Sequence, residues 1–379
     1  MRIVHLVSDL SRAGTQRQVM IVARGQAALG HRVTILVAGP TYDLGPELDA
    51  AGLRWMAIPQ VSRVRLPLKL GGVINYALIV GTLLRLRPQI VHSHGFLTHH
   101  RRLAMTARRL TGVRLVHKEV NVPGCFPEHY RAVAAELAAR TGCIVANCRA
   151  VRDALVAELG YDPAKIQVVY NALDMEGYRV VDAPTDPPTV GIIGRFDPEK
   201  RHEDFLEAAA LVAAEHPTVR FLIFGREEGA TAVRGREAFL RQRAEELGIA
   251  ERVEFRGPFT PAELPEVMAA ISVYTQPSEF EGLPNAVMEA MLYGRPCVVT
   301  EAGGMPELVG NGGVGIVTPV RDPKALAAAW MRLLADAELR RRLGEAAHKR
   351  VVKLCAPEAV VGTLDLIYRR LLTGREDVT

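Results

Sequence analysis

Short apolar runs alternate with longer amphipathic segments along the whole chain of 379 residues. Residues 3–7, 33–37 and 90–94 are examples of the short runs, and segment 16–29 between the first two has apolar residues at helical spacing. Strands buried in a parallel sheet have such unbroken apolar runs, and their alternation with helical segments is typical of βαβ units. The sequence therefore predicts an α/β fold in which helices cover both faces of parallel sheets.

The alternation occurs in two series, which are separated by the Pro- and Asp-rich stretch VVDAPTDPPT. The chain is longer than one ordinary domain, and 49% of its residues are hydrophobic, which is enough for two cores. A break of this composition is typical of an interdomain linker. We expect a first domain at 1–174, a linker at 175–188, a second domain at 189–355, and a C-terminal helix within 356–379 that crosses back to the first domain.

Charge is distributed unevenly along the chain. Residues 1–170 contain 22 Lys and Arg against 10 Asp and Glu, a balance of +12, and the remainder has 25 against 32, a balance of −7. The first half is therefore expected to contact something anionic, such as a phosphorylated acceptor or an anionic membrane surface. Nucleic acid is not expected, because no nucleic-acid-binding motif accompanies the charge. The basic clusters flank an apolar helical segment and comprise Arg63, Arg65, Lys69, Arg85, Arg87, Arg101, Arg102, Arg108 and Arg109.

Cysteine content and the N-terminus indicate a reducing compartment. The five cysteines are an odd number without a C-x-x-C pair, so a disulfide framework is not expected. The start, MRIVHLVSDL, leads directly into a strand-like run and does not have the pattern of a signal peptide. The longest apolar run, at 73–84, is shorter than the roughly 20 residues of a spanning helix. We expect a cytoplasmic protein whose membrane contact is peripheral, on the inner face.

The stretch PSEFEGLPNAVMEAM, residues 277–291, follows a predicted strand and enters a helix near Asn285. Glu281 and Glu289 have seven residues between them, so one lies on the loop and the other about one turn inside the helix. Main-chain amides at a helix N-terminus suit a phosphate, and two carboxylates beside them suit sugar hydroxyls. A solvated helix start with a favourably placed Glu would have the same spacing. The donor-binding residues predicted from this stretch are Gly282, Leu283, Pro284, Asn285 and Glu289.

This pattern, PS-x-x-EG-x-PNAVMEAM-x-x-G-x-P, resembles the signature of glycosyltransferase family four. The resemblance implies the GT-B fold, which consists of two facing Rossmann-like domains with the active site in the cleft between them. It also implies that Glu281 contacts the donor sugar and that Glu289 contacts the nucleotide ribose.

A second motif, GRFDPEKR, follows the first predicted strand of the second half and resembles the family's Gly-Arg…Lys element. The resemblance implies that Arg195 and Lys200 bind the donor diphosphate beside Gly194. An Arg fork and a Lys ammonium can stabilise the charge that builds on a leaving nucleoside diphosphate. A charged loop that opens a solvated helix is the alternative interpretation.

Four further segments extend the resemblance over the chain. SDLSRAGTQRQVM has Ala13-Gly14 where the family usually has two glycines. IVHSHGF resembles the V-H-x-H strand, which would direct His94 toward the acceptor side, although a buried and satisfied histidine fits equally. FLIFG and VEFRGPF match the stretches that hold the nucleotide, which implies donor contacts for Gly225 and for Arg256 against the base.

The stretch VRLVHKEVN departs from the family, because the usual catalytic His would fall near Val120. Either His117 serves from an offset strand, or Lys118, Glu119 or Asn121 contributes instead.

No D-x-D motif occurs in the sequence, so neither a metal site nor a cofactor other than the donor is indicated. The resemblance implies a retaining hexosyltransferase that uses a UDP- or GDP-sugar and a saccharide or lipid-linked acceptor. Cell-surface polysaccharide or glycolipid biosynthesis is the expected setting. A sugar-nucleotide epimerase of the same fold and a non-catalytic sugar- or nucleotide-binding protein are the alternatives.

Overall fold

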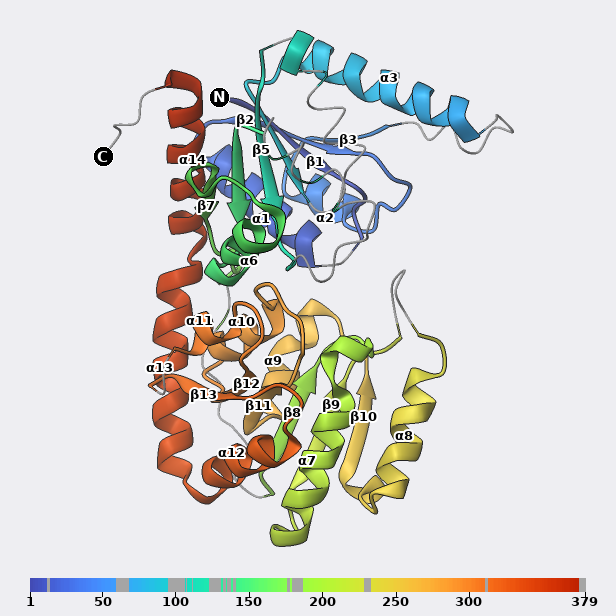
Figure 1. Cartoon of the computed structure of the whole chain (residues 1–379), viewed down its shortest axis with the longest axis vertical. Coiled ribbons are helices and arrows are strands. Elements are labelled where there is room, and N and C mark those ends of the chain that lie inside the picture. The colour runs from blue at the N-terminus through green and yellow to red at the C-terminus, as the bar shows by residue number, and fades with distance from the viewer. Residues whose placement is uncertain are drawn as a thin grey trace. The chain divides into compact units, whose positions relative to one another are not determined.

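The computed structural model describes residues 1–11, 14–58, 68–94, 112–122, 141–175, 187–227, 233–310 and 313–374, together with 106, 108–110, 131, 134, 138 and 178; at 68–73 and 75 it describes the backbone only. The chain divides into two compact units (Figure 1). The first unit comprises Met1–Asp174 and Cys355–Thr379, and the second comprises Met175–Leu354.

The first unit contains a sheet whose seven described strands are parallel, in the order β3-β2-β1-β4-β5-β6-β7. Its strands are β1 (Arg2–Val7), β2 (Arg32–Val37), β3 (Trp55–Ala57), β4 (Ile90–His94), β5 (Arg114–Glu119), β6 (Cys143–Ala146) and β7 (Ile166–Val168). Its described helices are α1 (Gly14–Ala28), α2 (Gly45–Ala50), α3 (Leu68–Leu86), α6 (Arg149–Leu159) and α14 (Pro357–Thr373), with a short 3-10 turn, η3 (Pro163–Lys165).

Successive side chains of β1 enter different cores, because a strand directs alternate residues to opposite faces of the sheet. Ile3 packs with residues of α1 and α14, whereas Val4 and Leu6 pack with residues of α3. The strands are therefore buried on both faces, as their unbroken apolar sequences indicate.

The second unit contains a parallel sheet whose six described strands have the order β10-β9-β8-β11-β12-β13. Its strands are β8 (Thr189–Ile193), β9 (Arg220–Phe224), β10 (Val253–Gly257), β11 (Val273–Gln276), β12 (Cys297–Thr300) and β13 (Gly315–Thr318). Its helices are α7 (His202–Glu215), α8 (Arg236–Glu246), α9 (Leu264–Ala269), α10 (Asn285–Leu292), α11 (Met305–Val309), α12 (Pro323–Ala335) and α13 (Ala337–Cys355), with 3-10 turns η4 (Pro198–Lys200), η5 (Ala250–Arg252) and η6 (Pro261–Glu263).

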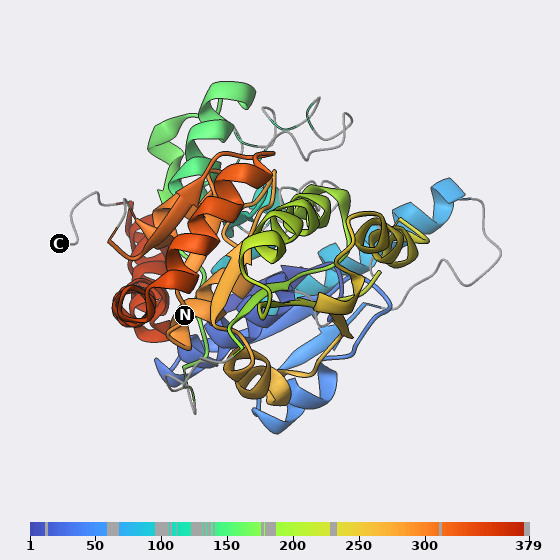
Figure 2. The ribbon, with the colours of Figure 1, turned by 90° about the horizontal axis from the view of Figure 1, so that it is seen from below.

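The core of the second unit is centred on Trp330 of α12, which is fully buried. Its ring lies 5.2 Å from the ring of Phe205 on α7 and 6.1 Å from that of Phe221 on β9. These contacts fix α7 and α12 side by side on one face of the sheet (Figure 2). The predicted α/β class is confirmed in both units.

Helix α13 was not predicted by the apolar alternation. Its sequence is rich in charged residues and has Gly344 in its interior, which lowers helix propensity. A Cβ at Gly344 would lie 2.1 Å from the carbonyl oxygen of Gly294, so the glycine permits a close approach of two backbones. None of the described helices combines the length and apolar character needed to cross a bilayer.

Candidate active site

The order of strands in the second unit reverses between the neighbouring strands β8 and β11. From β8 the chain continues to β9 and β10 on one side, and from β11 it continues to β12 and β13 on the other. Ligands of open α/β sheets bind at such a switch point, outside the carboxyl ends of the strands. The two loops that leave these ends are 194–200 and 277–284, which contain the two motifs found in the sequence.

Lys200 and Glu281, which lie 81 positions apart in the sequence, form an ion pair at this point. The Lys200 Nζ is 2.6 Å from Glu281 Oε1, and the side chains are 19% and 10% exposed. Because both side chains are partly exposed, an anion in solution can reach the ion pair and compete for the Lys200 ammonium. A diphosphate that takes the ammonium would release the carboxylate for other partners.

A chain of buried side chains holds Glu281 from behind. Tyr274 Oη donates to Gln276 Oε1 at 2.7 Å, Gln276 Nε2 donates to Ser278 Oγ at 2.8 Å, and Ser278 Oγ donates to Glu281 Oε1 at 2.9 Å. Tyr274, Gln276 and Ser278 alternate along β11 and its continuation, so they lie on one face. Each is at most 1% exposed, and burial raises the pKa of Tyr274 well above its usual range. The phenol therefore stays protonated as the first donor of the chain.

The loops after β8 and β11 are also joined through their backbones. The N–H of Glu279 donates to the carbonyl of Glu199 at 2.8 Å. Arg321 holds the carboxylate of the same Glu279 with distances of 2.8 and 2.9 Å. Glu279 thus fixes the loop of Glu281 relative to the loop of Lys200.

The loop after β12 packs onto the Glu281 loop through a pair of glycines. Gly304 donates its N–H to the carbonyl of Gly282 at 2.7 Å. Gly303 has φ of +54°, and a Cβ there would lie 1.8 Å from the carbonyl oxygen of Glu281. Only a glycine fits this conformation and this approach without strain. The two glycines of the sequence EAGG, residues 301–304, therefore allow this loop to pack directly against the backbone of Glu281.

Gly194 and Gly225 have a comparable relation at the base of the loops. Gly194 donates its N–H to the carbonyl of Phe224, and a Cβ at Gly225 would lie 1.9 Å from the carbonyl oxygen of Gly194. The sequence analysis predicted both glycines as donor contacts. Their geometry explains why both positions are glycine, because the backbones of the two loops pack closely there.

Arg195 and the start of α10 complete the group of candidate donor contacts. Arg195 lies on the loop of Lys200 with its side chain 47% exposed, and one guanidinium nitrogen is 2.5 Å from Asp197 Oδ2. Helix α10 begins at Asn285, and the first amides of any helix lack intrahelical acceptors and carry partial positive charge. Glu289 is half-buried one turn further along the helix.

Comparisons with known proteins identify the family of this chain. Residues 178–350 match the family of group 1 glycosyl transferases, and residues 13–172 match the glycosyl transferase 4-like domain. The D-inositol 3-phosphate glycosyltransferase of Acidothermus cellulolyticus is 30% identical over 310 residues, which cover 76% of this chain and 68% of that protein. The chain belongs to the group 1 glycosyltransferases. Its relative in Corynebacterium urealyticum, also a D-inositol 3-phosphate glycosyltransferase, is 28% identical over 91% of this chain and 86% of its own length.

Solved structures show that this glycosyltransferase has the GT-B fold that the resemblance implied. Anabaena Alr3699/HepE in complex with UDP matches with a TM-score of 0.83 at 21% identity, covering 97% of this chain and all of that one. A glycosyltransferase from Rickettsia africae matches with a TM-score of 0.81 at 17% identity, covering 99% of both chains.

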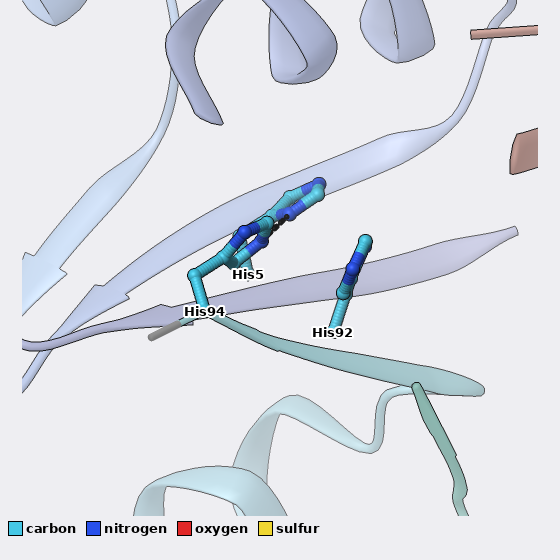
Figure 3. Close-up of side chains that lie close together, drawn as sticks. All are labelled: His5, His92 and His94. Atoms are coloured by element: carbon cyan, nitrogen blue, oxygen red, sulfur yellow. Dashed lines mark hydrogen bonds between the residues drawn. The ribbon is translucent and has the colours of Figure 1, made fainter. Parts of the chain in front are cut away.

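In the first unit of this glycosyltransferase, His94 ends β4 and belongs to a buried histidine cluster with His5 of β1 and His92 (Figure 3). His5 Nδ1 is 2.9 Å from His94 Nε2, and His5 Nε2 is 2.8 Å from Gln26 Oε1. Burial lowers the pKa of His5 to about 4 and those of His92 and His94 well below the usual value, so the rings are neutral.

Three neutral imidazoles whose nitrogens lie within 4.8 Å of one another provide ligand types that suit a transition metal. However, the rings of His92 and His94 are stacked, with centroids 4.3 Å apart and planes 29° apart. A metal ion must lie in the plane of each ring that binds it, and two rings stacked in this way have no shared in-plane position close to both. The cluster is therefore best described as part of the core, where His92 Nδ1 also lies 2.6 Å from Tyr368 Oη. Two of its ring nitrogens, His92 Nε2 and His94 Nδ1, have no hydrogen-bond partner among the described residues.

His117 lies within β5 and not at its end. Its Nδ1 is 2.7 Å from Ser93 Oγ, its Nε2 is 2.7 Å from Glu119 Oε1, and all three side chains are buried. Lys118 points to the other face and donates to Asn171 Oδ1 at 2.9 Å. Strand β5 ends at Glu119, so Val120, near which the resemblance places the family's His, is the first residue after the strand.

The remaining predicted residues have other surroundings. Arg256 is on the edge strand β10, where it lies 2.5 Å from Glu254, and it has no hydrogen bond or ion pair with Lys200 or Glu281 among the described residues. Gly14 begins α1, whereas Ala13 lies outside the described residues. So do the side chains of the basic cluster members Arg63, Arg65, Lys69, Arg101 and Arg102.

His202, which the sequence placed beside the diphosphate motif, is fully buried at the start of α7 and packs edge-on against Phe196 with ring centroids 5.2 Å apart. Burial, together with the charges of Arg236 and Lys200, lowers the pKa of His202 to about 3. The ring is neutral near pH 7 and is not a proton donor there.

Proposed function

We propose that this enzyme transfers a glycosyl group, with retention of anomeric configuration, from a nucleoside-diphosphate sugar to a hydroxyl of an anionic acceptor. The observation that carries the proposal is the Lys200–Glu281 pair at the switch point between β8 and β11. It combines a cation for the diphosphate with a carboxylate for the sugar on two interlocked loops.

In this proposal Lys200 leaves Glu281 and binds the diphosphate, assisted by Arg195 and the first amides of α10. Glu281 then accepts hydrogen bonds from hydroxyls of the donor sugar, and Ser278 keeps its carboxylate oriented. Glu289 has the corresponding role for the ribose. These positive groups neutralise the diphosphate, so the proposal includes neither a metal nor another cofactor.

Chemically, the bond between the anomeric carbon and the diphosphate oxygen breaks, and a bond from the same carbon to the acceptor oxygen forms on the same face. The acceptor's hydroxyl proton passes to an oxygen of the departing diphosphate. Lys200 and Arg195 stabilise the charge that develops on that leaving group, which is the step where fixed cations lower the barrier.

The positive balance of +12 over residues 1–170 supports an acceptor with negative charge. Phosphorylated polyols, the class named in the curated relatives, and lipid-linked saccharides with a diphosphate both meet this requirement. A lipid-linked acceptor would give the enzyme a peripheral position on the inner membrane face in cell-surface polysaccharide or glycolipid biosynthesis. Binding to vesicles with anionic lipid that decreases with salt is then expected, and no binding at low salt would exclude this setting.

A thermal-shift screen with UDP, GDP and their sugars identifies the donor, because a ligand of the folded state raises the melting temperature. Incubation of that donor with inositol phosphates and with lipid-linked saccharides should release free nucleoside diphosphate and form a glycoside. An isomerised donor without glycoside would identify an epimerase and refute the proposal.

A further inference from the structure

A pocket lies in the first unit, at the edge of the sheet where the strands begin. Arg2 and Arg32 open β1 and β2, Arg54 directly precedes β3, and Arg85 is in the last turn of α3. The pocket is open and has a space of about 580 Å³, counted out to the surrounding solvent. Its lining is Arg2, Ile3, Val4, Arg32, Thr34, Arg54, Arg85, Leu86 and Pro88.

The lining contains four arginines and no acidic residue. Arg2 and Arg32 occupy matched positions on neighbouring parallel strands, where like charges repel. No ion pair with a carboxylate is found for any of the four among the residues that the structure describes. For Arg54 and Arg85 the sequence explains this, because residues 50–118 contain twelve Lys and Arg and neither Asp nor Glu. The charge is therefore uncompensated within this part of the chain.

Two further contacts show that the pocket has more than loose surface charge. The guanidinium of Arg2 is anchored by the hydrogen bond that its Nε donates to the carbonyl of Arg87 at 2.7 Å, and the main-chain N–H of Arg2 donates to Gln89 Oε1 at 3.0 Å. Thr34 is only 4% exposed, lines the pocket, and has no hydrogen-bond partner for its hydroxyl among the described residues. This hydroxyl is not fully buried, so it reaches the open pocket and can donate a hydrogen bond to a molecule there.

We propose that this pocket is a binding site for a small soluble molecule that carries a diphosphate or two phosphate groups. Guanidinium forks match phosphate oxygens, and the Thr34 hydroxyl adds a directed hydrogen bond. The site belongs to the first unit and is formed by the amino ends of its strands, whereas the proposed donor site belongs to the second unit. It therefore goes beyond the proposed transfer reaction.

Titration calorimetry with inorganic pyrophosphate tests the site. The full chain carries Lys200→Ala in every sample, so that the proposed donor site contributes less to the signal. Arg32→Ala and Arg85→Ala are each expected to weaken binding by about tenfold or more, as for a lost charge-assisted hydrogen bond. Thr34→Val keeps the volume of the side chain and is expected to weaken binding about two- to tenfold. Melting temperatures confirm that each variant is folded.

Arg342→Ala is the matched control, because Arg342 is exposed on α13 and its substitution removes the same charge outside the pocket. It should bind pyrophosphate as the parent does. The proposal is overturned if the parent does not bind pyrophosphate, if Thr34→Val has no effect, or if Arg342→Ala weakens binding as much as Arg32→Ala. Binding only to vesicles of phosphatidylcholine and phosphatidylglycerol, and not to pyrophosphate, would assign the charge to a membrane and equally overturn it.

Discussion

Replacing Ser278 by alanine removes the hydroxyl that links Glu281 to the buried chain from Tyr274. The change deletes the 2.9 Å hydrogen bond to Glu281 Oε1 and leaves Gln276 Nε2, on a side chain that is 1% exposed, without its acceptor. Hydrogen bonds to charged groups contribute about 1.5–3 kcal/mol, and an unsatisfied buried donor adds a cost of similar size. We expect the free energy of unfolding to fall by about 2 kcal/mol. We also expect kcat to fall about tenfold, which corresponds to about 1.4 kcal/mol of transition-state stabilisation.

Thr275→Val provides the matched control for this variant. Thr275 neighbours the same chain on β11 and is fully buried, but its hydroxyl donates to the carbonyl of Val298. Both variants remove one buried hydroxyl and nearly preserve volume, so urea unfolding should show comparable losses of stability. Steady-state transfer with the donor found by thermal shift should then decrease only in Ser278→Ala, with binding of the nucleoside diphosphate unchanged. Equal activity in the two variants would refute the role assigned to Ser278.

Two further predictions concern stability. Burial lowers the pKa of His5 to about 4 and that of His202 to about 3, so both rings bind protons near pH 6.5 in the unfolded state but not in the folded state. The free energy of unfolding should therefore decrease as the pH falls, by about 4 kcal/mol for the two residues between pH 7 and 5. Urea unfolding at each pH measures this decrease. A stability that is constant over this interval would contradict the buried, neutral state of both rings. Gly303→Ala should cost at least about 2 kcal/mol and abolish transfer, because φ is +54° and the new Cβ meets the Glu281 carbonyl, whereas Gly313→Ala, with open space around it, should leave both unchanged in the same assays.

The sequence was most informative where a motif coincides with a strand end. The alternation of apolar runs predicts the strands, and the topology of a parallel sheet then brings the loops after β8 and β11 together. Lys200 and Glu281 were for this reason predictable as neighbours, although 81 positions separate them.

Hydrogen-bond partners were not predictable in the same way. The link from Tyr274 through Gln276 and Ser278 depends on which face of β11 lies toward Glu281, and the sequence YTQPS indicates only that its polar residues alternate. The available signal was that every second side chain along this buried strand is polar. The ion pair of Arg256 with Glu254 depends on side-chain orientation at a sheet edge, which a motif does not specify.

The structural role of a glycine could not be predicted from the sequence either. Gly225 and Gly344 both allow backbones to approach, within a loop and within a helix respectively. From the sequence, helix propensity marks Gly344 as a helix breaker, and the family resemblance marks Gly225 as a ligand contact. The distinction depends on tertiary contacts with Gly194 and Gly294, which only the folded structure provides.

Calorimetric titration of the selected nucleoside diphosphate into wild type, Lys200→Ala and Glu281→Gln tests the central claim most directly. If Lys200 binds the diphosphate and Glu281 the sugar, Lys200→Ala weakens binding by about tenfold or more, whereas Glu281→Gln binds at least as tightly as wild type and yet does not transfer sugar. Wild-type affinity in Lys200→Ala, or normal turnover in Glu281→Gln, would contradict the account.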